Sequence, residues 1–236
     1  MTESTGTQAG ATAATLKLTV GDLRIAHEVS LASGRVTAPE FVPVLQGLVN
    51  AVVEAAEQKA GAAISCRKGC GACCRQLVPI STSEGERLRA LVAAMPRERR
   101  QALGERFAAA AKVLEPFMAA NKGRSDREVS TGYFALGVAC PFLEEESCSI
   151  HAERPLVCRE YLVTSPAERC AGPAQEGVTP VAVPKFSAAA RTLQDDKDGW
   201  FPLALLMKQT RKPSGARRTG NEWLQRFLKG LGGRGI

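Results

Sequence analysis

The 236-residue chain has no apolar run of the roughly 18–20 residues that a membrane-spanning helix needs. Its first residues, Met1 to Gln8, lack the basic start and the apolar core of a secretory signal peptide. Aromatic residues make up only 5% of the chain, and its two histidines are too few for a histidine-built metal site. We therefore expect a cytoplasmic protein, whose cysteines stay reduced and do not form disulfides.

Positive charge is concentrated at the C-terminal end. The chain has 31 Lys and Arg against 24 Asp and Glu, a net charge of +7. Residues 208–236 carry eight basic side chains and one acidic one, Glu222, so residues 1–207 are neutral overall. This basic tail can contact an acidic partner or an anionic membrane, and the simpler interpretation is a solvated, partly disordered extension that keeps the protein soluble. It lacks interleaved aromatics and any nucleic-acid-binding motif, so we do not expect nucleic acid as the partner.

Apolar residues recur at helical spacing along most of the chain. They predict helices over residues 37–57, from 81–83 to 95, and over 97–120, two short helices over 186–193 and 199–208, and an amphipathic helix over 221–231 whose apolar side docks on the core. Capping boxes, Thr37 with Glu40 and Ser83 with Glu86, mark the first two starts. Residues 16–36 contain one or two strands or an irregular arm. Short β-like pieces flank the acidic residues 144–146, which we interpret as a solvated turn.

These patterns predict a mainly α protein with short β pieces, a helical domain built around a cysteine-ligated metal centre. We divide the chain into three parts: a disordered or irregular N-terminal arm (1–36), a cysteine-cluster metal-binding domain (37–207), and a basic C-terminal tail with a possible amphipathic helix (208–236).

All eight cysteines lie in two groups. The first has the spacing C-x3-C-x2-C-C within nine residues, and the second is spread over 31 residues. Thiolates are the preferred ligands of zinc and of iron–sulfur clusters. The candidate metal ligands are Cys66, Cys70, Cys73, Cys74, Cys140, Cys148, Cys158 and Cys170.

Two of these cysteines, Cys73 and Cys74, are adjacent in the sequence. Both can hardly bind one tetrahedral ion without strain, but they can serve two neighbouring metals or a polynuclear cluster. Two four-thiolate sites, one cluster with spare ligands, and a binuclear site therefore remain open. Metal-free buried thiols and a disulfide relay are the alternatives. Arg154 precedes Cys158 and is placed to hydrogen-bond a sulfur or a carbonyl, whereas His151 is more typical of a surface or supporting residue.

At these residues the sequence resembles the YkgJ-like cysteine-cluster family, with the shorthand CxxCxxCC, described as zinc- or iron-chelating. The shared motifs are Cys70-Gly71-Ala72-Cys73-Cys74, Cys140-Pro141-Phe142-Leu143, Cys148-Ser149-Ile150, and Arg154-Pro155-x-x-Cys158-Arg159 with Tyr161. The resemblance covers about residues 64–172. This chain has one extra residue between Cys66 and Cys70, and His151 stands where a tyrosine is usual. The resemblance implies metal chelation and leaves zinc and iron open.

We therefore interpret the chain as a metal-binding protein with an iron–sulfur centre or zinc, and we favour iron. A zinc-stapled structural or interaction module is one alternative. The other is an enzyme, because Cys66, Cys70 and Cys73 have the spacing that radical-SAM enzymes use, and the family looks related to flagellin lysine methylases. Two amphipathic helices follow the motif in place of the strand–helix units that a radical-SAM barrel needs, so we lean against an enzyme and assign no catalytic residue.

Overall fold

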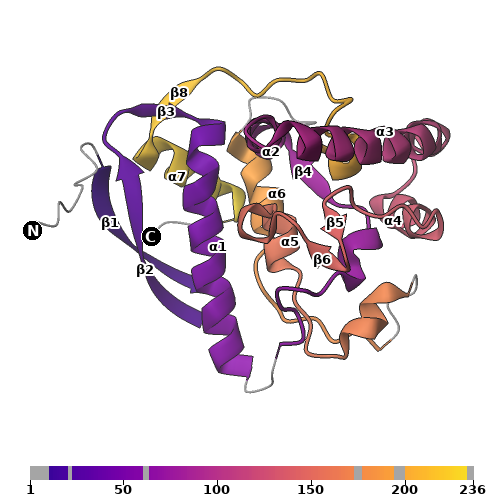
Figure 1. Ribbon diagram of the computed structural model, residues 1–236. Coiled ribbons are helices and arrows are strands. Elements are labelled where there is room, and N and C mark those ends of the chain that lie inside the picture. The colour runs from indigo at the N-terminus through magenta and orange to yellow at the C-terminus, as the bar shows by residue number, and fades with distance from the viewer. Residues whose placement is uncertain (1–10, 21–22, 61–63, 173–176, 194–199, 233–236) are drawn as a thin grey trace, which may run out of the picture.

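The structure is a computed structural model that describes residues 11–20, 23–60, 64–172, 177–193 and 200–232 (Figure 1). These residues form seven α-helices, which confirms the mainly α class. The helices are α1 (Ala38–Ala60), α2 (Thr82–Ala93), α3 (Arg97–Ala120), α4 (Asp126–Ala135), α5 (Leu156–Glu160), α6 (Phe186–Ala190) and α7 (Gly220–Gly230). The short 3-10 helices are η1 (Ala72–Arg75), η2 (His151–Glu153), η3 (Ala167–Ala171), η4 (Arg191–Leu193) and η5 (Leu203–Leu205).

The strands of the described residues pair two by two and antiparallel, as β1–β2, β3–β8, β4–β7 and β5–β6. Their bounds are β1 (Ala11–Val20), β2 (Leu23–Ala32), β3 (Arg35–Thr37), β4 (Pro79–Ser81), β5 (Leu143–Glu144), β6 (Ser147–Cys148), β7 (Trp200–Pro202) and β8 (Arg217–Thr219). No parallel pair occurs in this part of the chain, so the strand series of a radical-SAM barrel is not seen there.

The N-terminal region is more regular than an arm, because β1 and β2 are ten-residue strands. The alternation of apolar residues places Leu16, Ile25, Val29 and Leu31 on one buried face of the hairpin. This face packs on α1, and this packing stabilises a hairpin that pairs with no other described strand. Residues 16–36 were expected to form either strands or an irregular arm, and the structure has strands there. Residues 1–10 lie outside the described part.

Helix α1 lies between the hairpin and the rest of the molecule (Figure 1). Half of the predicted capping box is confirmed, since the Thr37 backbone N–H donates to Glu40 Oε2 at 2.6 Å. The C-terminal helix α7 joins the same core through Trp223 and Phe227, as its apolar stripe predicts. Trp223 Nε1 also donates to Val36 O at 2.8 Å, next to the pairing of β3 with β8. Much of the basic tail is thus built into the core around α1.

A second core joins α2, α3 and the β4–β7 pair. The predicted capping box at Ser83 and Glu86 is wrong, because the box that starts α2 is Ser81 with Glu84. The helix predicted over 199–208 is also wrong: Trp200–Pro202 pairs with β4 as a strand, and only a 3-10 turn follows. Helices α4 and α5 were not predicted. Each is only five to ten residues long, too short for a clear apolar period.

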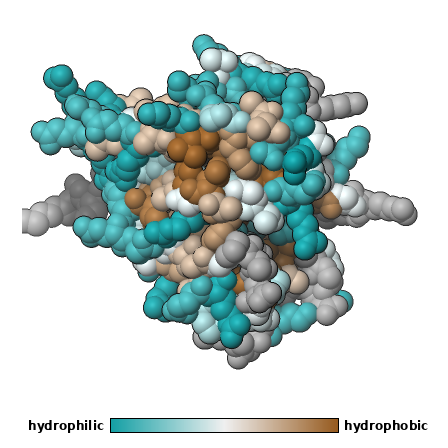
Figure 2. Space-filling view, turned by 90° about the vertical axis from the view of Figure 1, so that its right-hand side faces the viewer, coloured by the Kyte–Doolittle hydropathy of each residue, from teal (hydrophilic) through white to brown (hydrophobic). Residues whose placement is uncertain are grey.

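The view in Figure 2 shows a mostly hydrophilic surface around a central hydrophobic patch. Among the described residues, the large apolar side chains that are exposed are Val113, Leu136 and Met207. No helix in the described ranges is both long enough and apolar enough to cross a membrane.

Candidate metal centre

The eight cysteines are free thiols. They lie in six segments: the loop before η1, η1, the loop before β5, β6, α5 and η3. Cys170 is buried and the other seven are partly buried. Six of them line one cavity of about 110 Å³: Cys70, Cys73, Cys74, Cys140, Cys148 and Cys158. Cys66 and Cys170 flank this group, since their thiols have Cys70 and Cys73 as electrostatic neighbours. The fold therefore brings both cysteine groups of the sequence to one place.

The first cysteine loop reaches the second group through close backbone contacts. The Cys140 backbone N–H donates to Cys74 O at 2.7 Å. Gly71 lies against the β5–β6 turn, where an added Cβ would stand 2.5 Å from Glu146 O and 2.7 Å from Leu143 Cδ1. Only glycine fits such an approach, so Gly71 holds the two loops together.

The acidic turn is exposed at Glu145 and Glu146, as expected of a solvated turn, and two arginines also hold it in place. Arg75, at the end of η1, binds Glu146 with two bonds of 2.6 and 2.9 Å. Arg106 of α3 binds Glu144 at 2.7 Å. Glu145 and Glu146 both have positive φ, 48° and 55°, a conformation that costs energy for a side-chain-bearing residue. These ion pairs supply part of the restraint that the strained turn needs.

Helix α5, which carries Cys158, is anchored by a buried carboxylate from α2. The Leu156 backbone N–H, at the start of α5, donates to Glu84 Oε1 at 2.9 Å. The other oxygen of Glu84 accepts from Ser81, so one carboxylate caps two helices. Burial raises the pKa of Glu84. Nothing in the amphipathic pattern of α2 indicates this role.

Two charged neighbours of Cys158 anchor the other side of α5. Arg159 donates to Asn50 Oδ1 of α1 at 2.9 Å, to Arg154 O, and to Ala152 O. Burial is the main cause that lowers the pKa of Arg159, to about 10. Glu160 accepts from the backbone N–H of Ser187, in α6, at 2.9 Å. The sequence motif includes Arg159 next to Cys158, but nothing in it indicates either role.

The thiols sit in surroundings that disfavour their anionic form. Burial raises the pKa of Cys140 to about 12, and it raises the pKa of Cys158 well above its usual value. The charges of neighbouring thiolates add to both shifts. The pKa of Cys73 is also raised, first by its hydrogen bond with Cys74 and then by burial. Such a set becomes favourable as thiolates only when a cation neutralises it.

Backbone amides and nearby arginines favour the anionic form of the sulfurs. The backbone amides of Phe142 and Ile150 donate to the sulfurs of Cys140 and Cys148 and lower their pKa values. The Arg154 guanidinium lines the cavity and lowers the pKa of Cys66, Cys73, Cys148 and Cys158. Amide-to-sulfur hydrogen bonds and nearby cations are the usual means of tuning thiolate metal sites.

Arg154 is positioned by His151. Its Nη1 lies 3.0 Å from His151 Nε2, which must be the acceptor because guanidinium nitrogens only donate. Burial lowers the pKa of His151, so the ring is neutral near pH 7. Arg154 Nε is buried and has no hydrogen-bond partner. One buried N–H beside the thiols is thus available to a sulfur atom, which fits the role expected for Arg154.

Within the described residues, no three His, Cys, Asp or Glu side chains are already arranged to coordinate one ion. Coordination therefore requires the thiols to rotate towards a common centre. The donor set, the buried Arg154 Nε–H and the cavity volume fit a cysteine-bound metal group, with the sulfurs of the six lining cysteines as the available ligands.

Fold and site together define a helical domain with a cysteine-lined cavity. Residues 65–175 match the family model of the CxxCxxCC domain, described as "Putative zinc- or iron-chelating domain". The matched range contains all eight cysteines, and it confirms the resemblance inferred from their motifs. The match supports metal binding. No curated protein and no solved structure matches the chain.

Proposed function

We propose that this protein binds an iron–sulfur cluster through the cysteines of the cavity and serves as a metal or electron carrier. The observation that carries the proposal is the set of six cysteines around one cavity of about 110 Å³. A single tetrahedral zinc ion takes four sulfur ligands, so six lining thiols exceed what one zinc ion uses.

The thiol electrostatics support a particular set of four ligands. The charge of Cys73 raises the pKa of Cys140, Cys148 and Cys158. The charges of Cys140 and Cys148 also raise the pKa of Cys158. We therefore assign Cys73, Cys140, Cys148 and Cys158 as the main ligands. Cys66, Cys70 and Cys170 form a second neighbourhood around Cys73 and supply further ligands if a second metal is present.

A zinc-stapled structural module is the second candidate. It is favoured by the way the cavity joins segments far apart in the chain, namely η1, β6 and α5. The radical-SAM alternative has less support, because the described strands form only two-stranded antiparallel pairs. We therefore do not propose an enzyme.

The decisive measurement is iron, zinc and acid-labile sulfide content, with an absorption spectrum, on protein purified without oxygen. We expect iron and sulfide in comparable amounts and a brown protein. Cys158→Ser should lose most of the metal, and Cys70→Ser should lose less. Arg217→Ala, in β8 and remote from the cavity residues, is the matched control and should keep the wild-type content.

Zinc at one or two ions per chain without sulfide would overturn the iron–sulfur proposal and favour the zinc-stapled module. Protein that takes up neither metal, even after anaerobic reconstitution, would overturn metal binding altogether. Unchanged metal content in both cysteine variants would show that the ligands lie elsewhere.

A further inference from the structure

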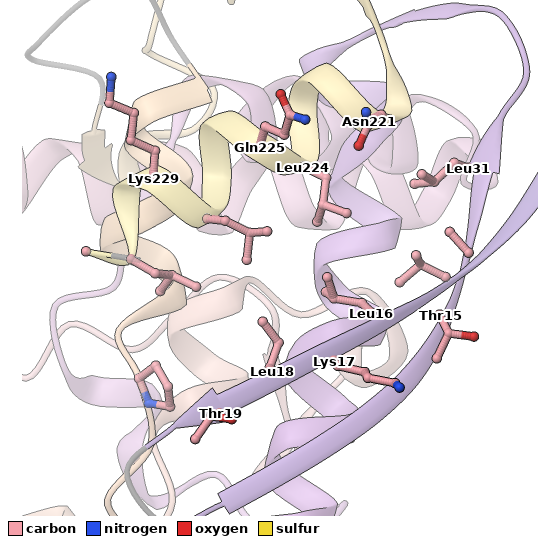
Figure 3. A pocket seen from close by; sticks show the side chains of 16 residues that line it. Thr15, Leu16, Lys17, Leu18, Thr19, Leu31, Asn221, Leu224, Gln225 and Lys229 are labelled. Atoms are coloured by element: carbon pink, nitrogen blue, oxygen red, sulfur yellow. The ribbon is translucent and has the colours of Figure 1, made fainter. Parts of the chain in front are cut away.

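A groove of about 1320 Å³ lies between β1 and α7, away from the cysteines (Figure 3). Leu16 and Leu18 of β1 face Leu224 of α7 across it. Leu228 and Leu231 extend the apolar wall at the C-terminal end of α7. This volume exceeds the roughly 300–1,000 Å³ typical of small-molecule pockets, so the groove suits a length of polypeptide better than a small ligand.

The groove follows the edge of a strand. Its lining includes the consecutive residues 14–19 of β1, whereas β2 contributes only Val29 and Leu31, which share one face. Successive side chains of a strand point to opposite faces of the sheet. A groove lined by consecutive residues therefore runs along an edge, where side chains of both faces are accessible. Within the described part of the chain, β1 pairs with β2 alone. No described residue pairs with its other edge, whose backbone N–H and C=O groups border the groove.

The charge of the groove is of one sign. Among its described lining residues, Lys17 and Lys229 are charged and none is acidic. Lys17 projects from the edge strand on the face opposite Leu16 and Leu18, whereas the amino group of Lys229 on α7 points away from β1 (Figure 3); both side chains are exposed. An occupant with carboxylates is therefore favoured. A second copy of β1 is a poor occupant, because residues 11–20 include Lys17 and no acidic residue.

We propose that this groove binds an extended segment of a partner protein, in which apolar side chains alternate with carboxylates. The segment pairs with the edge of β1 that borders the groove, as in other cases of strand addition. Its apolar side chains contact the leucines of α7, and its carboxylates, on the opposite face of the added strand, lie beside Lys17. This assigns a place and a chemistry to the acidic partner expected from the basic tail, and it does not depend on which metal the cysteines bind.

The test uses the full-length protein as purified and a fluorescein-labelled ten-residue probe in which leucine or valine alternates with glutamate. Fluorescence anisotropy should show saturable binding to the wild-type protein. The Lys17→Glu variant should bind at least tenfold more weakly. Lys112→Glu, an exposed substitution on α3, is the matched control and should bind like the wild type.

Two control probes separate strand addition from simple charge attraction. Methylating alternate amide nitrogens keeps all the side chains but blocks pairing along one edge, and it should abolish binding. Replacing every glutamate by lysine should also abolish it. Equal binding of the methylated probe would overturn the strand-addition proposal.

Other occupants give distinct results. A concentration-dependent dimer of the free protein, lost in Leu228→Arg, would show that a second copy fills the groove and would overturn the proposal. Failure of the probe to bind the folded wild-type protein would overturn it as well. Circular dichroism of each variant shows whether the fold is intact.

Discussion

Leu156 donates its backbone N–H to Glu84 at 2.9 Å, so a carboxylate of α2 caps the helix that carries Cys158. Glu84 is only 3% exposed, and it also accepts from Ser81 at the start of its own helix. The position of one candidate ligand thus depends on a buried charge 74 residues earlier in the sequence. Stability and metal binding should therefore be linked through this carboxylate.

Glu84→Gln should change how stability depends on pH. Burial raises the pKa of Glu84 in the folded protein above the ordinary value of 4.5, so the folded state holds this proton more tightly than the unfolded chain. The contribution of Glu84 to stability therefore falls as the pH rises above 4.5. Glutamine keeps an acceptor for Leu156 and cannot ionise. Urea unfolding at pH 5 and pH 7 should show less stability loss with rising pH in the variant, and an identical loss would contradict the assignment.

Gly71→Ala should separate the two cysteine loops. The new Cβ would stand 2.5 Å from Glu146 O, a backbone atom that has little freedom to move. We expect metal content to fall by at least half, measured per chain after anaerobic purification. Gly104→Ala is the matched control, since its Cβ meets nothing within 4 Å and alanine favours the helix by about 0.5–1 kcal/mol. Equal metal content in the two variants would show that the close approach is dispensable.

Arg154→Gln should weaken metal binding. The guanidinium favours the thiolate form of four cysteines and has one buried N–H beside them. Groups that support metal ligands in this way typically contribute about 10–100-fold to affinity. Competition with a chelator should show a loss in this range. Arg99→Gln, which removes an exposed cation 3.7 Å from Glu144, should retain the wild-type affinity; a matching loss there would indicate a general effect of charge.

Phe227→Ala tests whether the C-terminal tail is part of the core. Phe227 is fully buried and stacks with Phe186 at 5.9 Å between ring centroids. Its loss should lower the free energy of unfolding by about 3–5 kcal/mol. Lys229→Ala, an exposed neighbour in the same helix, should change it by less than about 0.5 kcal/mol. A small effect of Phe227→Ala in urea unfolding would mean that α7 is only loosely attached.

Local patterns predicted the long helices well and the short elements poorly. The cap at Thr37, the stop at Pro96 and the apolar stripe of α7 are signals contained within a few turns of chain. The box at Ser81 was misplaced by two residues because Ser83 and Glu86 offer the same spacing, and burial of Glu84 decides between them. Helix α5 has five residues and depends on contacts with α1, α2 and α6, so no local pattern could reveal it.

By itself the sequence determined the mainly α class, the eight thiols and their division into two groups, because these follow from composition and spacing. Only the tertiary structure decided that six thiols share a cavity, that Gly71 and Arg75 bring the two groups together, and that β1, paired with β2 alone among the described residues, borders a groove beside α7. These features join residues tens to hundreds of positions apart. They depend on which buried faces pack together, and that is a property of the folded chain as a whole.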